Sequence, residues 1–251
     1  MGSSETPPAP LLATEELHIG YGTGDSAILH DLSLALHPGE RVALLGANGS
    51  GKTTCLLALA ALLPIRSGRL LLDGEAWTGA AAQRRRWRPR IGLVVADPDD
   101  QLLAPIVRDD LAYGVRNAGF DERVVQARVH SVLDALTIAD LADRTIDTLS
   151  LGERKRVAIA GVLALEPDIL LLDEPTANLD RRGRDGLHTL LGRVAAAHRT
   201  VCVATHDTRF AVRWASRVVL LEHGRVIADG PPNRILRDRE LLDRAWLDAV
   251  D

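Results

Sequence analysis

The sequence predicts an α/β fold with a mostly parallel sheet, an N-terminal antiparallel β subdomain and a helical subdomain. A glycine-rich segment, GANGSGKT at residues 46–53, directly follows the apolar run VALL and precedes helical spacing. DILLLDE and VCVATHD are apolar runs that end in acidic or histidine residues, typical of parallel strands buried on both faces. Residues 106–148 show helical spacing with charges on the opposite face, which predicts a helical insertion.

The remaining elements follow in chain order. Short apolar or alternating segments separated by Gly, Asp and Pro-Gly predict strands within residues 14–45. Helical spacing then runs from Lys52 to Pro64. The segment RSGRLLLDGEAW predicts a hairpin strand, and IGLVVAD predicts a buried strand. VVLLEHGRVIADG predicts a terminal hairpin, and RILRDRELLDRAWLDAV a closing helix. We therefore expect a flexible tail at 1–12, one domain at 13–245 with its helical subdomain at about 100–160, and a C-terminal end at 246–251.

Composition excludes several classes of protein. The 251 residues suffice for one substantial α/β domain, and the formal net charge of -4 gives no global attraction to nucleic acid or anionic lipid. Cys55 and Cys202 lie in apolar stretches without partners at metal-ligand spacing, so we expect buried free thiols in a reducing compartment. No apolar run approaches the ~20 residues that a membrane-spanning helix needs.

The glycine-rich segment has the spacing GxxxxGK[ST] of a phosphate-binding loop. Glycines let backbone N–H groups wrap a β-phosphate, and the following helix adds the partial positive charge of its N-terminus. Lys52 should bridge the β- and γ-phosphates, and Thr53 should hold Mg²⁺. The predicted nucleotide-binding residues here are Gly46, Ala47, Asn48, Gly49, Ser50, Gly51, Lys52, Thr53 and Thr54.

Two acidic residues end the strand DILLLDE. Asp173 can reach Mg²⁺ from the strand end, and Glu174 lies one residue further toward the γ-phosphate side. We predict that Glu174 is the general base that polarises the attacking water. Taken alone, such a pair could equally be a solvated turn, and the phosphate loop upstream favours the catalytic interpretation.

The segment LSLGE, followed one helix later by LLLDEP, resembles the ATP-binding cassette family, whose members hydrolyse ATP with Mg²⁺ as face-to-face dimers. The resemblance implies that Ser150 and Gly152 contact the γ-phosphate bound by the opposite subunit. It further implies that Asp180 of TANLD lies at the dimer seam and that Tyr21 stacks on adenine. His206 of THD is expected to contact the γ-phosphate and to form the catalytic set with Lys52 and Glu174. A packed surface tyrosine is the alternative for Tyr21.

Two departures from this family pattern stand out. Ala96 occupies the position where relatives carry a glutamine that approaches Mg²⁺ and the attacking water. Gln101, five residues later, is an open alternative for that role. Leu151 replaces a glycine of the signature, a change that costs loop freedom if its φ must be positive, and Glu153 in place of glutamine is a milder change.

The run DPDDQLLAPIVRDDLAYG is similar to the ATPases of energy-coupling-factor importers and their cobalt and nickel relatives. This resemblance implies an ATP-binding and hydrolysing subunit, peripheral on the cytoplasmic face of the cell membrane, that serves import of a vitamin or a transition metal ion. The implied partners are a second ATPase subunit, a transmembrane coupling subunit that docks near residues 96–115, and a substrate-binding membrane protein. Nucleic acid is not expected as a partner.

Two other functions remain as alternatives. Ala96 and Leu151 would suit a partly degenerate nucleotide-binding partner in a heterodimeric transporter, although Glu174 and His206 argue against full degeneracy. A soluble cassette ATPase acting on DNA or ribosomes is disfavoured, because the chain has neither a long coiled coil nor a second cassette.

Overall fold

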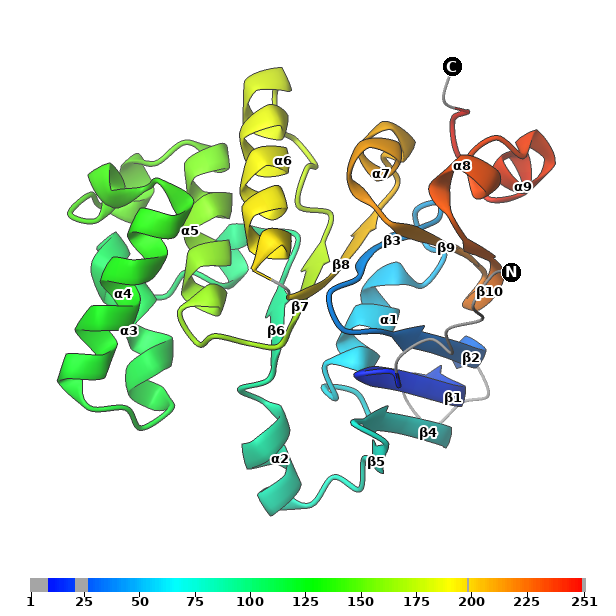
Figure 1. The fold of residues 1–251 in the computed structure, drawn as a ribbon, viewed down its shortest axis with the longest axis horizontal. Helices are drawn as coiled ribbons and strands as arrows, with labels where there is room; N and C mark the ends of the chain where they lie inside the picture. Colours follow the sequence, from blue (N-terminus) through cyan, green and yellow to red (C-terminus); the bar gives the residue numbers. More distant parts are fainter. Residues whose placement is uncertain (1–8, 21–26, 198, 250–251) are drawn as a thin grey trace, which may run out of the picture.

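The computed structural model describes residues 9–20, 27–197 and 199–249 and contains two β-sheets flanked by helices (Figure 1). The first sheet is antiparallel and has the order β2-β1-β4-β5. Leu12, Leu17, Ile19 and Leu29 of this sheet are fully buried, which explains why these short apolar segments form strands. Its strands are β1 (Leu12–Gly20), β2 (Ala27–Leu36), β4 (Ser67–Leu72) and β5 (Glu75–Ala76).

The second sheet has the order β10-β9-β3-β8-β7-β6 and is parallel except at the edge hairpin β9-β10. Every residue of β7 and β8 is buried, in agreement with the predicted strands that are covered on both faces. The mostly parallel sheet and the antiparallel subdomain confirm the predicted fold class. The strands are β3 (Arg41–Leu45), β6 (Ile91–Val94), β7 (Ile169–Asp173), β8 (Thr200–Thr205), β9 (Arg217–Glu222) and β10 (Arg225–Gly230).

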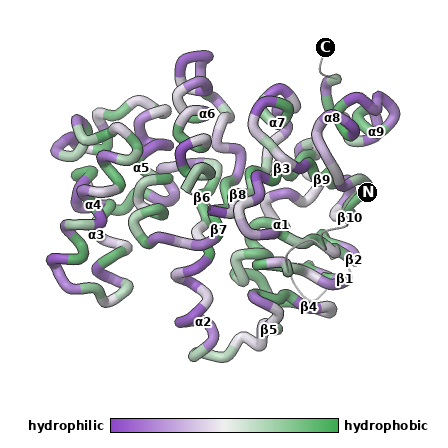
Figure 2. Tube along the Cα trace, in the orientation of Figure 1, coloured by the Kyte–Doolittle hydropathy of each residue, from purple (hydrophilic) through white to green (hydrophobic). Residues whose placement is uncertain are grey.

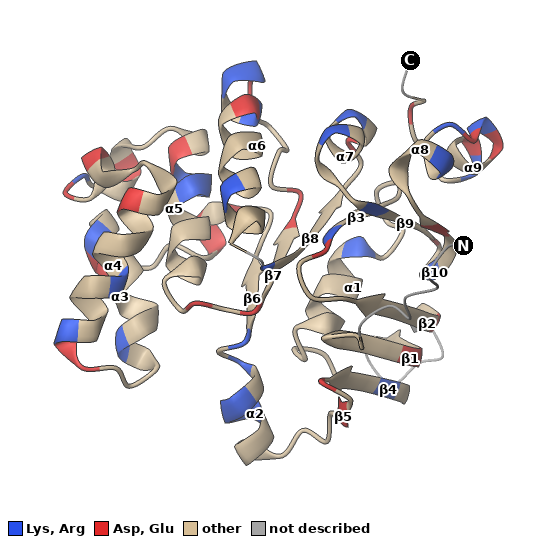
Figure 3. Cartoon of the chain, in the orientation of Figure 1, with Lys and Arg blue, Asp and Glu red and all other residues tan. Residues whose placement is uncertain are grey.

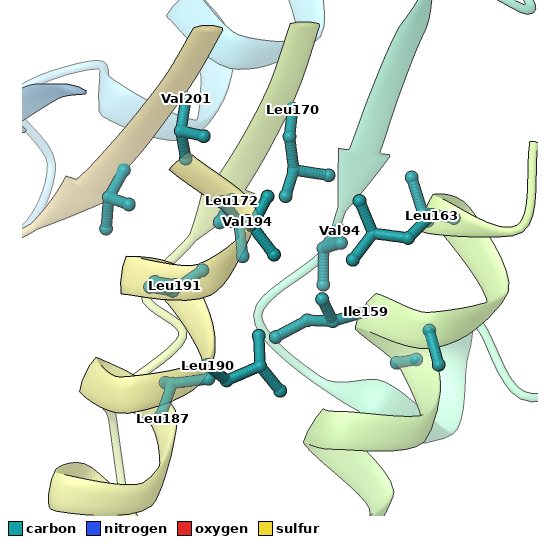
Figure 4. Packing of buried hydrophobic residues seen from close by; sticks show 14 of the residues in the cluster. Val94, Ile159, Leu163, Leu170, Leu172, Leu187, Leu190, Leu191, Val194 and Val201 are labelled. Carbon is teal, nitrogen blue, oxygen red and sulfur yellow. The ribbon is translucent and has the colours of Figure 1, made fainter. Parts of the chain in front are cut away.

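Helices from the middle of the chain form a separate layer beside β6. These are α3 (Val107–Asn117), α4 (Glu122–Leu136) and α5 (Leu151–Leu163). A 3-10 turn at 98–100 precedes α3, and two more at 139–141 and 146–148 lie between α4 and α5. Their apolar faces merge into one hydrophobic cluster with the sheet and with α6 (Arg181–Ala196). Figure 4 shows how Ile159 and Leu163 of α5 meet Val94 of β6 while Leu187 and Leu191 of α6 cover the strands.

A second hydrophobic cluster fills the space between the two sheets. Helix α1 (Lys52–Leu59) runs through it, with Cys55 and Leu59 fully buried beside Leu44 and Leu171 of the parallel sheet. Both cysteines are free and buried, as predicted, and burial raises the pKa of Cys202 to about 12. The phosphate loop is thereby held between two packed cores.

Several predicted boundaries differ from the structure. Leu12 is a fully buried strand residue and Leu11 N donates to Leu36 O, so the tail ends before residue 12. Helix α1 ends at Leu59 rather than near Pro64, because Ala61 adopts φ 55°.

The basic stretch after β5 contains a helix that the sequence did not predict, α2 (Ala81–Trp87). It is mostly hydrophilic (Figure 2) and is anchored by buried Gln83 and Trp87. The closing helix is in fact divided into α8 (Pro232–Ile235) and α9 (Arg239–Arg244), because Asp238 caps the second helix by accepting from Leu241 N.

Candidate functional site

The glycine-rich loop connects β3 to α1 and brings its glycines to positions where side chains do not fit. Gly49 and Gly51 have φ of 82° and 102°, in the region that favours glycine. A Cβ on Gly46 would lie 2.4 Å from Leu221 O. Lys52 Nζ donates to Gly46 O at 2.8 Å and to Ala47 O at 3.1 Å, so its ammonium lies inside the loop. The loop therefore folds around one cation, which its own carbonyl groups hold in place.

Asp173 lies at the carboxyl end of β7, directly beside the loop. Thr53 Oγ1 donates to Asp173 Oδ2 at 2.7 Å, although the two residues are 120 positions apart. Asp173 is only 6% exposed, and its Oδ1 has no hydrogen-bond partner among the described residues. Burial raises the pKa of Asp173, with the nearby Glu174 charge adding to the shift and the Thr53 hydrogen bond opposing it. A buried carboxylate oxygen without a partner next to a hydroxyl is a donor set that suits a hard cation.

Glu174 is held by groups from three elements. Its Oε1 lies 3.4 Å from Lys52 Nζ, and Thr205 Oγ1 donates to Oε2 at 3.3 Å. His206 Nδ1 lies 3.1 Å from both carboxylate oxygens. Glu174 also has φ 41°, a left-handed conformation that costs a non-glycine residue about 1–2 kcal/mol. Strained backbone of this kind is commonly found at functional sites.

Ala96 and Gln101 both lie in the loop that follows β6, and their contacts differ. Ala96 is exposed. Gln101 Oε1 accepts from Val95 N at 3.1 Å, and Gln101 Nε2 donates to Ala158 O at 3.5 Å. Gln101 therefore ties the end of β6 to α5, and its amide is committed to backbone groups rather than to the phosphate centre. The alternative that Gln101 replaces the missing glutamine is not favoured by this geometry.

The LSLGE segment forms the N-terminus of α5. Ser150 is the N-cap, and it makes a reciprocal capping box with Glu153: Glu153 N donates to Ser150 Oγ at 3.3 Å, while Ser150 N donates to Glu153 Oε2 at 2.7 Å. Ser150 hydrogen bonds hold the pKa of Glu153 below its ordinary value. Leu151 is the first helical residue and has no positive φ, so the expected loss of loop freedom does not arise.

An open cavity of about 890 Å³ lies beside this helix end. Gly152 lines it together with Asp180, which also caps α6 by accepting from Gly183 N at 2.7 Å. The cavity is thus bordered by the signature residues and by the TANLD segment, and it is separate in sequence from the phosphate loop. Thr54 is buried on α1, whereas Tyr21 falls outside the described residues.

Sequence reasoning missed one residue of this region, Lys155. Its ammonium is buried and donates to Glu174 O at 3.1 Å, Pro175 O at 3.2 Å and Ala177 O at 2.9 Å. Burial is the main cause that lowers the pKa of Lys155. The available signal was compositional, because Lys52 and Lys155 are the two lysines of an otherwise arginine-based chain. Both ammonium groups lie close to Glu174 in space: Lys52 Nζ is 3.4 Å from its Oε1, and Lys155 Nζ is 3.1 Å from its carbonyl oxygen.

Known proteins resemble this chain over nearly its whole length. Residues 29–177 match the model of the family described as ABC transporter. The chain is 46% identical, over 95% of its length and 85% of the relative, to the cobalt import ATP-binding protein CbiO of Rhodobacter capsulatus. It is 42% identical, over 94% of its length and 86% of the relative, to the energy-coupling factor transporter ATP-binding protein EcfA of Carboxydothermus hydrogenoformans.

A solved structure gives the same result. CbiO1 from Clostridium perfringens, part of the ABC transporter complex CbiONQ, superimposes with a TM-score of 0.84 at 35% identity, covering 93% of both chains. The family model, the relatives and the solved structure agree on the family and on the fold. The chain belongs to the ABC transporter family, in which it is an ATP-binding and ATP-hydrolysing subunit.

Proposed function

We propose that this chain is the ATPase of an energy-coupling-factor type importer that brings a transition metal ion such as cobalt or nickel, or a vitamin, across the cytoplasmic membrane. The names of the relatives support the proposal: one imports cobalt, and another belongs to an energy-coupling factor transporter. The observation that carries the catalytic part is the convergence of Lys52, Thr53, Asp173, Glu174 and His206 at one end of the parallel sheet.

The residue roles follow from these contacts. Glu174 accepts the proton of the attacking water, and His206 is positioned beside it to contact the γ-phosphate. Lys52 lies between the loop and Glu174, where it balances phosphate charge while the backbone N–H groups of 46–53 bind the phosphate oxygens. Thr53 and Asp173 would hold Mg²⁺, and the unpartnered Asp173 Oδ1 fits this role. When bound, the cation neutralises charge on the phosphate oxygens.

The signature end of α5 is proposed to serve the nucleotide of a second ATPase subunit. The backbone N–H groups at Leu151 and Gly152 lie at the positive end of a 13-residue helix, which suits a phosphate. Glu153 weakens this attraction for phosphate. Its carboxylate lies in the same first turn, and its lowered pKa keeps it negatively charged at neutral pH. A glutamine there would carry no charge.

This effect of Glu153 favours a second candidate function, that of a subunit in a heterodimer with two unequal ATP sites. In that case the chain's own catalytic set works normally, and its signature gives the partner's site a weaker contact. Asp180, at the border of the signature cavity, would lie on the dimer seam in either case. The helical conformation of Leu151 removes one reason to regard the signature as degenerate.

The membrane partner is proposed to dock near residues 96–115. Leu103 is 67% exposed and Tyr113 is 48% exposed, so two large apolar side chains face outward from this region. Among the described residues, no helix has both the length and the apolar character needed to cross a bilayer. We infer a peripheral position on the cytoplasmic face, with a transmembrane coupling subunit and a substrate-binding membrane protein as partners.

The catalytic proposal is tested by Glu174→Gln. We expect hydrolysis to fall by about 10²-fold or more, because the base is lost while the amide keeps the shape of the side chain. ATP should then accumulate in a stable dimer, measured by sedimentation of purified protein with Mg²⁺ and ATP beside a phosphate-release assay. Unchanged hydrolysis in the presence and absence of co-purified membrane subunits would show that Glu174 is not the base. Identification of those subunits by mass spectrometry tests the importer assignment separately.

A further inference from the structure

An open cavity of about 590 Å³ lies between α6 and α7 (Thr208–Trp214), and none of the residues proposed to bind the phosphates lines it. Its volume falls in the range of small-molecule sites, about 300–1,000 Å³. The two helices meet through His188 of α6 and Phe210 of α7, whose ring centroids are 6.1 Å apart in an edge-to-face arrangement. Phe210 stacks in turn on buried Trp214, with centroids 5.4 Å apart. The cavity therefore borders on a packed aromatic support.

Four arginines line the cavity, two from each helix, and Figure 3 shows basic residues on both helices. Arg181 and Arg184 are three residues apart on α6, and Arg209 and Arg213 are four apart on α7, so each pair shares a helix face. None of the four lies within 4.0 Å of a carboxylate oxygen in the described part of the chain. Like charges at this spacing destabilise a helix, and a bound anion would remove that cost.

The acidic residues of the cavity do not neutralise this cluster. Asp207 is engaged elsewhere, because its carboxylate caps α7 by accepting from Phe210 N at 2.9 Å. Asp185 is the other carboxylate of the lining, so four guanidinium groups face two carboxylates in a chain whose overall net charge is -4. A local excess of positive charge against a negative total marks an anion-binding surface.

The backbone anchors one of the four arginines, and a histidine of α6 completes the cavity wall. Arg184 Nε donates to Leu179 O at 3.0 Å, which holds this guanidinium in place. His188 lines the cavity, and its Nε2 is buried without a hydrogen-bond partner among the residues the structure describes. Because this nitrogen has almost no accessible surface, it lies behind the cavity wall and leaves the arginines as the donors available to a ligand. Guanidinium groups supply paired donors that match phosphate oxygens.

We propose that this cavity binds a small, soluble anion of the pyrophosphate class and that occupancy affects ATP turnover. The coupling would pass through α7, because Asp207 at its N-cap directly follows His206, which contacts Glu174. His206 can either contact Glu174 or be released from it. An anion whose affinity differs between these two states shifts the equilibrium between them, and regulation requires such a difference in affinity. This site is independent of the transported solute and of the proposed membrane partners.

The test is a calorimetric titration of the full chain with inorganic pyrophosphate. Excess ADP is present to fill the phosphate loop, and divalent cations are left out so that pyrophosphate is not chelated. Arg209→Gln/Arg213→Gln should weaken binding about tenfold or more, because two charge-assisted contacts are lost. The control Arg237→Gln/Arg239→Gln changes net charge equally at exposed positions outside the cavity and should bind like the parent chain.

If the parent and both double variants bind pyrophosphate with equal affinity, the proposal is wrong. It is also wrong if both variants lose affinity equally, because that result would indicate general charge attraction. Thermal unfolding of each variant checks that it is folded. The same variants are compared by sedimentation with ATP in the Glu174→Gln background. If the Arg209/Arg213 variant loses dimerisation while the parent binds no pyrophosphate, the arginines dock a second copy and the small-anion site is wrong. Pyrophosphate binding in a chain without ATPase activity would leave this site standing and refute only the catalytic proposal.

Discussion

Asp173 and Glu174 are adjacent in sequence but differ in their surroundings. Glu174 has Lys52, Thr205 and His206 as partners, whereas Asp173 is buried with one oxygen satisfied by Thr53 and the other unpartnered. Burying a carboxylate without full compensation costs free energy of folding. The raised pKa of Asp173 expresses that cost, which a bound cation would offset.

The first prediction concerns the stability of Asp173→Asn. Because the folded-state pKa of Asp173 lies above the ordinary carboxyl value, the ionised group reduces stability at neutral pH, and stability is regained as pH falls through the raised pKa. We therefore expect the variant to raise the free energy of unfolding by about 1 kcal/mol at pH ~7 without divalent cations, with little difference at pH ~3. Denaturant titrations at both pH values measure this.

Exposed Asp147→Asn is the matched control and should change stability at neither pH. Addition of Mg²⁺ and nucleotide should stabilise the parent chain and not the Asp173 variant. A variant that is less stable than the parent at neutral pH would mean that attraction to Lys52 outweighs burial.

At the scale of elements, α5 links two functional regions of the chain. Its N-terminus carries the Ser150 and Glu153 capping box beside the signature cavity. One turn later, Lys155 donates to three carbonyls in the segment that follows β7, so the helix is tied to the backbone of Glu174 itself. A displacement of α5 by a partner's nucleotide would therefore be transmitted to Glu174, the proposed catalytic base.

Lys155→Met tests this link. Methionine keeps an apolar stem of similar length but leaves the three carbonyls without the ammonium, so we expect a loss of about 1–3 kcal/mol in the free energy of unfolding. ATP turnover should fall as well, because the segment that carries Glu174 loses its anchor. Urea denaturation and phosphate release measure the two effects. The control is exposed Arg123→Met on α4, and equal behaviour of the two variants would contradict the anchoring role.

At the scale of the whole molecule, the β9-β10 turn joins the two sheets and the phosphate loop. Gly224 N donates to Ser50 O at 2.8 Å, and Gly224 O accepts from His30 N at 3.0 Å. A Cβ on Gly224 would lie 1.7 Å from Ile28 O, and the residue has φ 72°. The close approach of three segments at one glycine fixes the antiparallel sheet against the nucleotide-binding loop.

Gly224→Ala should therefore lower the free energy of unfolding by more than the strain of its positive φ alone, because the added methyl group also collides with backbone. Gly74→Ala is the matched control, because Gly74 has φ 76° and nothing within 4 Å of an added Cβ. We expect about 1 kcal/mol of destabilisation at Gly74 and more than ~2 kcal/mol at Gly224, where backbone has to move. Thermal and denaturant unfolding of both variants give the comparison. Similar losses at the two sites would show that the junction tolerates displacement.

Features that depend on neighbouring residues could be predicted from the order of the amino acids alone. The phosphate loop needs glycine at Gly49 and Gly51 because of their φ. The interiors of β7 and β8 are apolar because both faces of these strands are covered. These requirements are local, so they remain visible in the order of the letters. The proposed catalytic residues Lys52, Glu174 and His206 and the proposed metal ligand Asp173 could be grouped from the sequence, since parallel strands bring their carboxyl ends to one edge.

Contacts between residues that are distant in sequence became visible only in the folded chain. The sequence did not indicate that Gln101 would be bound to Val95 and Ala158, that Leu151 would be helical, or that Lys155 would reach the carbonyls after β7. The arginines of α6 and α7 are likewise separated by 28 positions between Arg181 and Arg209 and converge only through helix packing. Hydrogen bonding and burial act through space, and one-dimensional spacing does not record which segments will meet.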